Sequence, residues 1–275
     1  MKFVDVKTDI AFKKIFGSDQ HKEVLIGLLN AVLDLEGDRR IKSVTLKNPW
    51  QPPDIPILKE TILDIRAVDN RGISFIVEMQ VKDTHSFDKR AIYYTAKAYT
   101  SQIKKGVDYP KLNQVIFIGI LDFNSFEGEN YLTRHLILNR ETMNQELSDL
   151  EFNFIELTKF NKAEEDLVTI VDKWVYFIKN ADDLTMIPKS AAEIPELNEA
   201  YKIAEMNAWT EEELEIYDYW QIRDAENRYK NVEEFEKGIE KGKIEVARRL
   251  IVKGMTVEEA AEVAGVSVEV LRSGV

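Results

Sequence analysis

Two short runs rich in β-branched residues, 60–68 (ETILDIRAV) and 73–81 (ISFIVEMQV), flank the tripeptide Asn70-Arg71-Gly72. This arrangement predicts a β-hairpin whose three-residue loop places Gly in the left-handed conformation. If Asp69 faces Ile73, the numbers of every opposed pair sum to 142. Asp64 then lies opposite Glu78. The loop therefore predicts the register of the two strands.

Side chains alternate between the two faces of a strand, so this register sorts the hairpin by polarity. One face is wholly apolar and carries Leu63, Ile65, Phe75, Val77 and Met79. The other face gathers Glu60, Asp64, Arg66, Glu78, Gln80 and Lys82. A solvated polar face would give the same pattern. The convergence of the acids across two strands favours a site instead.

Opposed carboxylates lie roughly 5 Å apart at their Cβ atoms, where they repel and one pKa rises. A hard cation between Asp64 and Glu78 relieves this repulsion, and Mg²⁺ or Mn²⁺ suits oxygen ligands. Such an ion can polarise a phosphate and activate a water. Gln80 could orient that water, but an amide cannot act as a general base.

The rest of the chain predicts an α/β domain followed by a helical region. Expected helices cover 8–16, 21–34, 86–105 and 163–180, and expected strands cover 114–121, 131–138 and 152–157. The run QVIFIGIL at 114–121 is continuously apolar, which predicts a strand buried on both faces. In the third helix, Ile92, Ala96, Tyr99 and Ile103 mark the expected buried face. We expect two parts, 1–185 and 186–275.

Composition narrows the class of protein. The net charge of −12 opposes a protein that coats nucleic acid, although the segment 82–111 is locally basic. The absence of cysteine excludes disulfides and cysteine–zinc sites and fits a reducing cytosol. No stretch approaches the ~20 apolar residues of a membrane span. We therefore expect a soluble cytoplasmic protein with no membrane partner.

The last part of the chain predicts two short helices. Thr256 and Glu259 form a capping box, Gly265 turns the chain, and Ser267 can cap the next helix. The outline is that of a helix-turn-helix, but it has little basic surface after Arg249. We therefore favour a protein contact for these helices, such as a homodimer interface, over sequence-specific DNA binding.

The motifs resemble the PD-(D/E)XK nuclease family transposases, also called the Rpn family of recombination-promoting nucleases. The resemblance rests on LDIRAVDNRGISFIVEMQ, FDKRAIYYTAKAYTSQIKKGVDYPKLNQVIFIGIL, TDIAFKKIFG and GIEKGKIEVARRLIVKGMTVEEAAEVAGVS, which together cover the chain nearly end to end. It implies a restriction-endonuclease-like core, a mixed central sheet flanked by helices, that acts as a magnesium-dependent DNA endonuclease. By position, Asp64 and Glu78 match the metal-binding acids and Gln80 the third catalytic residue.

Two positions depart from the pattern of the wider superfamily. Leu63 replaces the signature proline, and Gln80 stands where many relatives carry lysine, although the Rpn branch tends to have Gln there. Lys82, two residues further, is a candidate for the missing positive charge and for a DNA contact. An inactive nuclease fold that binds DNA or protein as a regulator is the alternative function, and an oligomerisation scaffold is a third.

Four further residues are candidates. Asp9 could add an acid to the site, or it could serve only the helix dipole and an ion pair with Lys13. Arg90 and Tyr94, one turn apart, could touch the phosphodiester backbone, or they could simply pack. Lys97 is expected to approach the same backbone.

Overall fold

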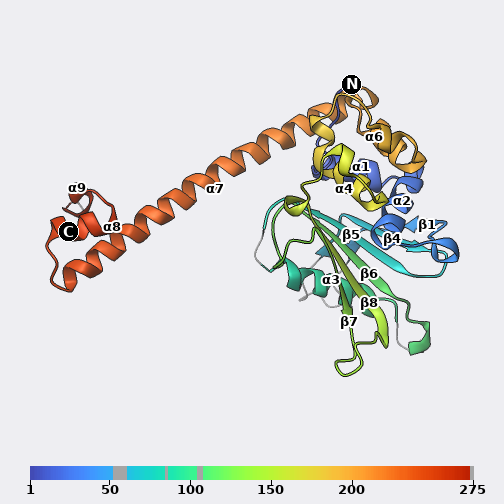
Figure 1. Cartoon of the computed structure of the whole chain (residues 1–275), viewed down its shortest axis with the longest axis horizontal. Coiled ribbons are helices and arrows are strands. Elements are labelled where there is room, and N and C mark those ends of the chain that lie inside the picture. Colours follow the sequence, from blue (N-terminus) through green and yellow to red (C-terminus); the bar gives the residue numbers. More distant parts are fainter. Residues whose placement is uncertain (52–60, 84–85, 104–107, 273–275) are drawn as a thin grey trace. The chain divides into compact units, whose positions relative to one another are not determined.

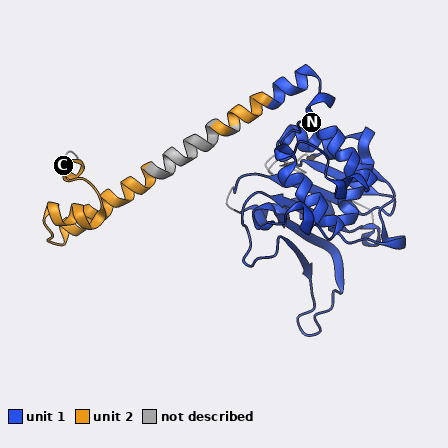
Figure 2. Cartoon of the chain, turned by 45° about the horizontal axis from the view of Figure 1, so that its top comes forward, with its two compact units in different colours: residues 1–217 blue, residues 218–275 orange. Residues whose placement is uncertain are grey.

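The computed structural model describes residues 1–51, 61–83, 86–103 and 108–272. They form two compact units, Met1–Tyr217 and Asp218–Val275 (Figure 2). The change in composition near residue 186 does not coincide with this division. Leu197 and Tyr201, which lie beyond residue 186 on helix α6 (Pro195–Ala204), are buried in the hydrophobic core of the first unit. A functional separation of 1–185 from 186–275 stays a prediction.

A mixed six-stranded sheet forms the centre of the first unit (Figure 1). Its strands, in spatial order, are β1 (Val44–Leu46), β4 (Ile65–Asp69), β5 (Ser74–Gln80), β6 (Val115–Leu121), β8 (Leu147–Glu156) and β7 (Leu132–Ile137). The pairs β5–β6 and β6–β8 are parallel, whereas the others are antiparallel. A separate short pair joins β2 (Trp50–Gln51) to β3 (Thr61–Ile62).

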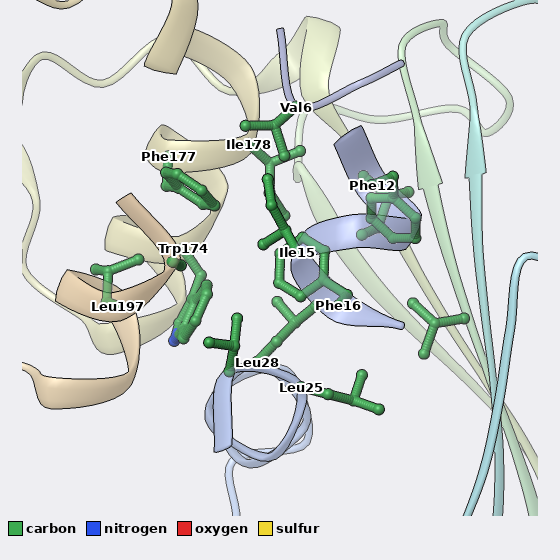
Figure 3. Close-up of a cluster of buried hydrophobic side chains, with 14 of the residues drawn as sticks. Val6, Phe12, Ile15, Phe16, Leu25, Leu28, Trp174, Phe177, Ile178 and Leu197 are labelled. Atoms are coloured by element: carbon green, nitrogen blue, oxygen red, sulfur yellow. The ribbon is translucent and has the colours of Figure 1, made fainter. Parts of the chain in front are cut away.

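Helices cover both faces of the sheet. Their bounds in the first unit are α1 (Asp9–Phe16), α2 (Lys22–Val32), α3 (Phe87–Thr100), α4 (Ile170–Asn180), α5 (Lys189–Ala192) and α6 (Pro195–Ala204). On what we call the α1 face, Phe12, Phe16, Leu28, Trp174 and Phe177 form part of the main core (Figure 3). The other face, here the α3 face, carries a second cluster. All seven residues of β6 are buried, which confirms a strand covered on both sides.

The buried side of α3 differs from the expected one. Ile92 is 57% exposed, while Phe87, Ala91, Thr95 and Ala98 are buried. Phe87 starts the helix and packs its ring against three phenylalanines of the α3-face cluster, so this large residue decides which side turns inward. Residues 104–107, the expected end of this helix, lie outside the described residues.

The hairpin has the predicted register. Ile65 pairs with Val77 and Arg66 with Ile76, and the backbone N–H of Asp69 donates to the carbonyl of Ile73 at 3.0 Å. Gly72 closes the loop with a φ of +88°. The loop chemistry therefore sets which residues of β4 and β5 oppose each other.

The first strand of the hairpin is interrupted, however, at Leu63 and Asp64. We expected one strand over 60–68, but β3 ends at Ile62 and β4 begins at Ile65. The backbone N–H of Leu63 donates to the carbonyl of Pro49, and Leu63 belongs to the α3-face cluster rather than sharing a face with Ile65. The assignment of Leu63 was wrong because strict alternation does not continue through a bend.

The start of the chain is tied to the end of α6. The backbone N–H of Val4 donates to the carbonyl of Ala204, and that of Met206 donates to the carbonyl of Lys2, both at 2.9 Å. The backbone N–H of Asp5 donates to the hydroxyl of Tyr217 at 2.7 Å. These bonds join the two ends of the first unit directly beside α1.

The second unit holds most of α7 (Glu211–Val252), together with α8 (Val257–Ala264) and α9 (Val268–Arg272). The capping box of Thr256 and Glu259 and the left-handed Gly265 are present as predicted. Ala247, Ala260, Ala261 and Leu271 form its small core. Among the described helices, none combines the length and the apolarity needed to cross a membrane.

Replacing Gly72 by Ala should destabilise the hairpin by about 2 kcal/mol. A non-glycine residue at this φ is strained by roughly 1–2 kcal/mol, and the new Cβ would lie 3.0 Å from the side chain of Asn113. Gly128→Ala is the matched control, because Gly128 has a φ of +89° but open space around it. Urea unfolding should show the larger loss for Gly72→Ala; equal losses would exclude a role for Asn113.

Candidate active site

Asp64 and Glu78 face each other where β4 starts beside the end of β5. The backbone N–H of Asp64 donates to Oε1 of Glu78 at 3.0 Å, and the backbone N–H of Met79 donates to Oδ2 of Asp64 at 2.8 Å. Each carboxylate thus accepts a backbone hydrogen bond from the opposite strand. The bend at Leu63 and Asp64 makes room for these side-chain bonds.

The surroundings of the pair oppose full ionisation. Glu78 is only 6% exposed, and burial, followed by the negative charge of Asp64, raises its pKa to about 8. Burial also raises the pKa of Asp64, while the Met79 N–H and Lys13 act against this rise. Burial and the charge of Asp64 therefore favour the protonated form of Glu78 near neutral pH, and a cation could replace that proton.

Two cationic side chains approach the acids from opposite faces of the sheet. Lys13 on α1 lies 3.9 Å from Oδ1 of Asp64, and Arg90 on α3 donates to Oε1 of Gln80. The positive charge of Arg90 lowers the pKa of both acids. From the sequence, we predicted for Lys13 only an ion pair with Asp9 on the same helix. Its place on the polar side of α1 was the signal that could have revealed its contact with Asp64.

Asp9 lies at the rim of this group. Its side chain is 66% exposed, and its Oδ1 is 2.6 Å from Nζ of Lys13, which is the predicted helix ion pair. Asp9 nevertheless raises the pKa of Asp64 through its charge. The acid is therefore near the site and connected to it through Lys13.

The candidate DNA-binding residues occupy different positions. Tyr94 is within electrostatic reach of the pair, because Glu78 and Asp64 help to raise its pKa, although burial is the main cause. Lys97 lies one turn further along α3. Lys82 follows the end of β5 in a bend, so strand alternation no longer determines where its side chain points.

Asp64 and Glu78 suit a magnesium ion better than a metal that needs many protein ligands. Within the described residues, no group of three or more His, Cys, Asp or Glu side chains could hold a metal ion. Magnesium commonly uses one or two carboxylates and keeps several waters. Two close oxygen donors with a raised pKa fit that requirement.

Glu78→Gln should stabilise the protein at alkaline pH. The folded pKa of about 8 lies above the usual 4.5, so the native state binds more protons between these values and stability falls as pH rises. Gln keeps an oxygen for the Asp64 N–H but has no proton to lose. Thermal unfolding should show a higher Tm than wild type at pH ~8 and little difference at pH ~5.

Glu129→Gln, at an exposed loop position, is the control and should leave the pH profile unchanged. A Glu78→Gln variant that is no more stable than wild type at the higher pH would show that Glu78 is not held in its protonated form.

Comparison with known families adds one finding. Residues 6–230 match the family described as PD-(D/E)XK nuclease family transposase. Neither the curated proteins nor the solved structures give a significant match. The mixed six-stranded sheet with flanking helices fits the restriction-endonuclease-like α/β fold of this family. Because the match covers most of the chain, the protein belongs to the PD-(D/E)XK nuclease family transposases.

Proposed function

We propose that this protein is a metal-dependent DNA endonuclease that uses magnesium, with manganese as a substitute. The observation that carries the proposal is the pair Asp64 and Glu78, which backbone N–H groups hold face to face. A structural ion pair would instead bring opposite charges together. Two opposed acids, one of them buried, oppose folding unless a proton or a cation relieves their repulsion.

Asp64 and Glu78 would hold the ion through the oxygens that their backbone bonds leave over. Oδ2 of Asp64 and Oε1 of Glu78 accept N–H groups, so Oδ1 and Oε2 are the natural ligands. When bound, such an ion polarises a phosphate and lowers the pKa of a bound water. The fixed carboxylates supply the orientation, because neither can turn without losing its backbone bond.

Arg90 would provide the positive charge that lysine provides at the third catalytic position of many relatives. Its guanidinium donates to Oε1 of Gln80, which places a permanent cation at the tip of that side chain. The amide nitrogen of Gln80 then serves as the donor to an attacking water or to the phosphate. Tyr94, Lys97 and Lys82 would contact the DNA backbone beside this centre. Cuts of this kind would supply the DNA ends that recombination uses.

A catalytically inactive fold that binds DNA or protein is the second candidate. It is favoured by Gln80, whose amide cannot take a proton from water. Asp9 is too exposed and too closely paired with Lys13 to be the obvious replacement. DNA binding without cleavage in any divalent ion would support this candidate.

Asp64→Asn should lower the rate of plasmid cleavage by about 100-fold, or about 3 kcal/mol. Asn keeps an oxygen for the Met79 N–H but removes the charge that would hold the ion. Wild type should cleave with magnesium and lose activity in EDTA, as judged by gel analysis of supercoiled DNA. A loss below about tenfold would contradict the assignment of Asp64 as a metal ligand.

Asp9→Asn, measured in the same cleavage assay, distinguishes a catalytic role of Asp9 from a position at the rim of the site. A loss comparable to that of Asp64→Asn would make Asp9 part of the catalytic group, while a loss of about threefold or less matches a rim position. Glu245→Gln, in an exposed ion pair of the second unit, is the control.

We also propose that α7 forms a homodimer contact. Ile239 and Val246 are one heptad apart, so they share a side of the helix, and they are 44% and 50% exposed. α8 and α9 cover the small core of the unit without burying these two side chains. A second copy of the same helix would bury them.

Replacing Ile239 and Val246 together by Glu should convert the dimer to a monomer, because like charges would then face each other across the contact. The mass from light scattering coupled to gel filtration measures this change. Val252→Glu is the control, since Val252 is 88% exposed at the end of α7 and off the Ile239 side. A wild-type protein with the mass of one chain would exclude the contact.

A further inference from the structure

Arg66 lies on the α3 face of the sheet, where no described residue pairs with its charge. It is half-buried on β4 and pairs with Ile76, whose side chain lies in the α3-face cluster. Its Nε atom is buried and has no hydrogen-bond partner. Within the part of the chain that the structure describes, no carbonyl or carboxylate accepts a hydrogen bond or ion pair from this guanidinium.

Such a position is costly for an arginine. A guanidinium has five N–H donors and stays charged at any ordinary pH, and burying a charged group without a partner opposes folding. Burial accordingly lowers the pKa of Arg66, and no acid among the described residues counters this shift. Nε of Arg90 also lacks a partner among the described residues, but another nitrogen of the Arg90 guanidinium donates to Gln80. An anion from outside the chain would supply the missing partner.

The place of Arg66 indicates which anion that would be. Arg66 is the second residue of β4 and lies two residues beyond Asp64, which is about 7 Å along an extended chain. This is close to the spacing of neighbouring phosphates along one nucleic-acid strand. Arg66 lies on the same side of the sheet as Glu78. Arg66 pairs with Ile76, and Ile76 and Glu78 point to the same face because they are two residues apart on β5.

The direction of α3 extends this argument. α3 connects the parallel strands β5 and β6, so it runs back against them. Arg90 contacts Gln80 at the end of β5, and Lys97 lies about 10 Å further back along the helix. Since β4 is antiparallel to β5, Arg66 is displaced from Asp64 in this same direction. Two basic groups thus follow the acids along the α3 face, one on the sheet and one on the helix.

We propose that Arg66 binds a backbone phosphate of DNA next to the phosphate that is cut. Guanidinium groups form two parallel hydrogen bonds to a phosphate, and this geometry fixes the position of the strand. The proposal rests on the proposed function, because it takes Asp64 and Glu78 as the point of cleavage. It makes Arg66 a substrate-binding residue and assigns it no proton transfer.

Binding of duplex DNA by the full chain tests the proposal separately from cleavage. Calcium replaces magnesium, and fluorescence anisotropy gives the affinity over a series of salt concentrations. Arg66→Met should weaken binding by about tenfold and lower the slope of log affinity against log salt by about one. Arg66→Lys should keep the salt slope, since it keeps the charge, and lose part of the affinity. Arg249→Met, which breaks an exposed ion pair in the second unit, should change neither quantity.

Thermal unfolding of the same variants separates binding from folding. Without DNA, Arg66→Met should be at least as stable as wild type, because it removes a half-buried charge that no described residue pairs with. Unchanged affinity and salt slope in Arg66→Met would overturn the proposal. A fall in Tm for both Arg66 variants with no change in the salt slope would make the residue structural and would also overturn it.

The outcomes for the two proposals differ. Wild type that binds DNA but does not cut it in magnesium or manganese overturns the nuclease function; if Arg66→Met then weakens binding, Arg66 remains a contact to a DNA phosphate, but not one next to a cut. Wild type that cuts DNA while Arg66→Met binds and cuts normally overturns only the role of Arg66. Failure of wild type to bind DNA under any of these conditions overturns both.

Discussion

At the junction of β4 and β5, two carboxylates take the place of backbone carbonyls as hydrogen-bond acceptors. Asp64 accepts the N–H of Met79, and Glu78 accepts the N–H of Asp64. The chain between β3 and β4 bends where these side-chain acceptors replace carbonyls. The bend turns Leu63 to the α3 face. The acids are therefore held together by the same bonds that join the strands. The folded sheet therefore keeps the two carboxylates close enough to repel each other. A proton or a cation relieves this repulsion.

The charges around this pair would allow an acidic protein to approach DNA, as the proposed function requires. The net charge is −12, yet Lys13 and Arg90 act on the two acids through their positive charges. They come from two different elements, α1 and α3. A positive field of this kind is local, because exposed charges more than about 10 Å away are largely screened by salt.

The sequence predicted the parts of the site that depend on local rules. Gly72 and the two-residue alternation gave the register, and hence the opposition of Asp64 and Glu78. The bend at Leu63 could not be predicted, because it arises from side-chain bonds that form only when the strands are paired. The prediction of the buried side of α3 was also wrong, because that side depends on tertiary packing. Phe87 has more apolar surface than Ile92 and takes the inner position. Lys13 reaches Asp64 through the packing of α1, which periodicity does not describe.

The pairing of the first residues with the end of α6 has a consequence for synthesis. Lys2 and Val4 find their partners only when Ala204 and Met206 have been made, and Asp5 finds its partner only with Tyr217. The hairpin with both acids leaves the ribosome much earlier. During that interval α1, which brings Lys13 to Asp64, lacks the α6 neighbours that complete its packing. The group formed by Asp64, Glu78 and Lys13 is thus incomplete in a nascent chain until nearly the whole first unit has been translated, and under the proposed function this would delay any attack on nearby DNA.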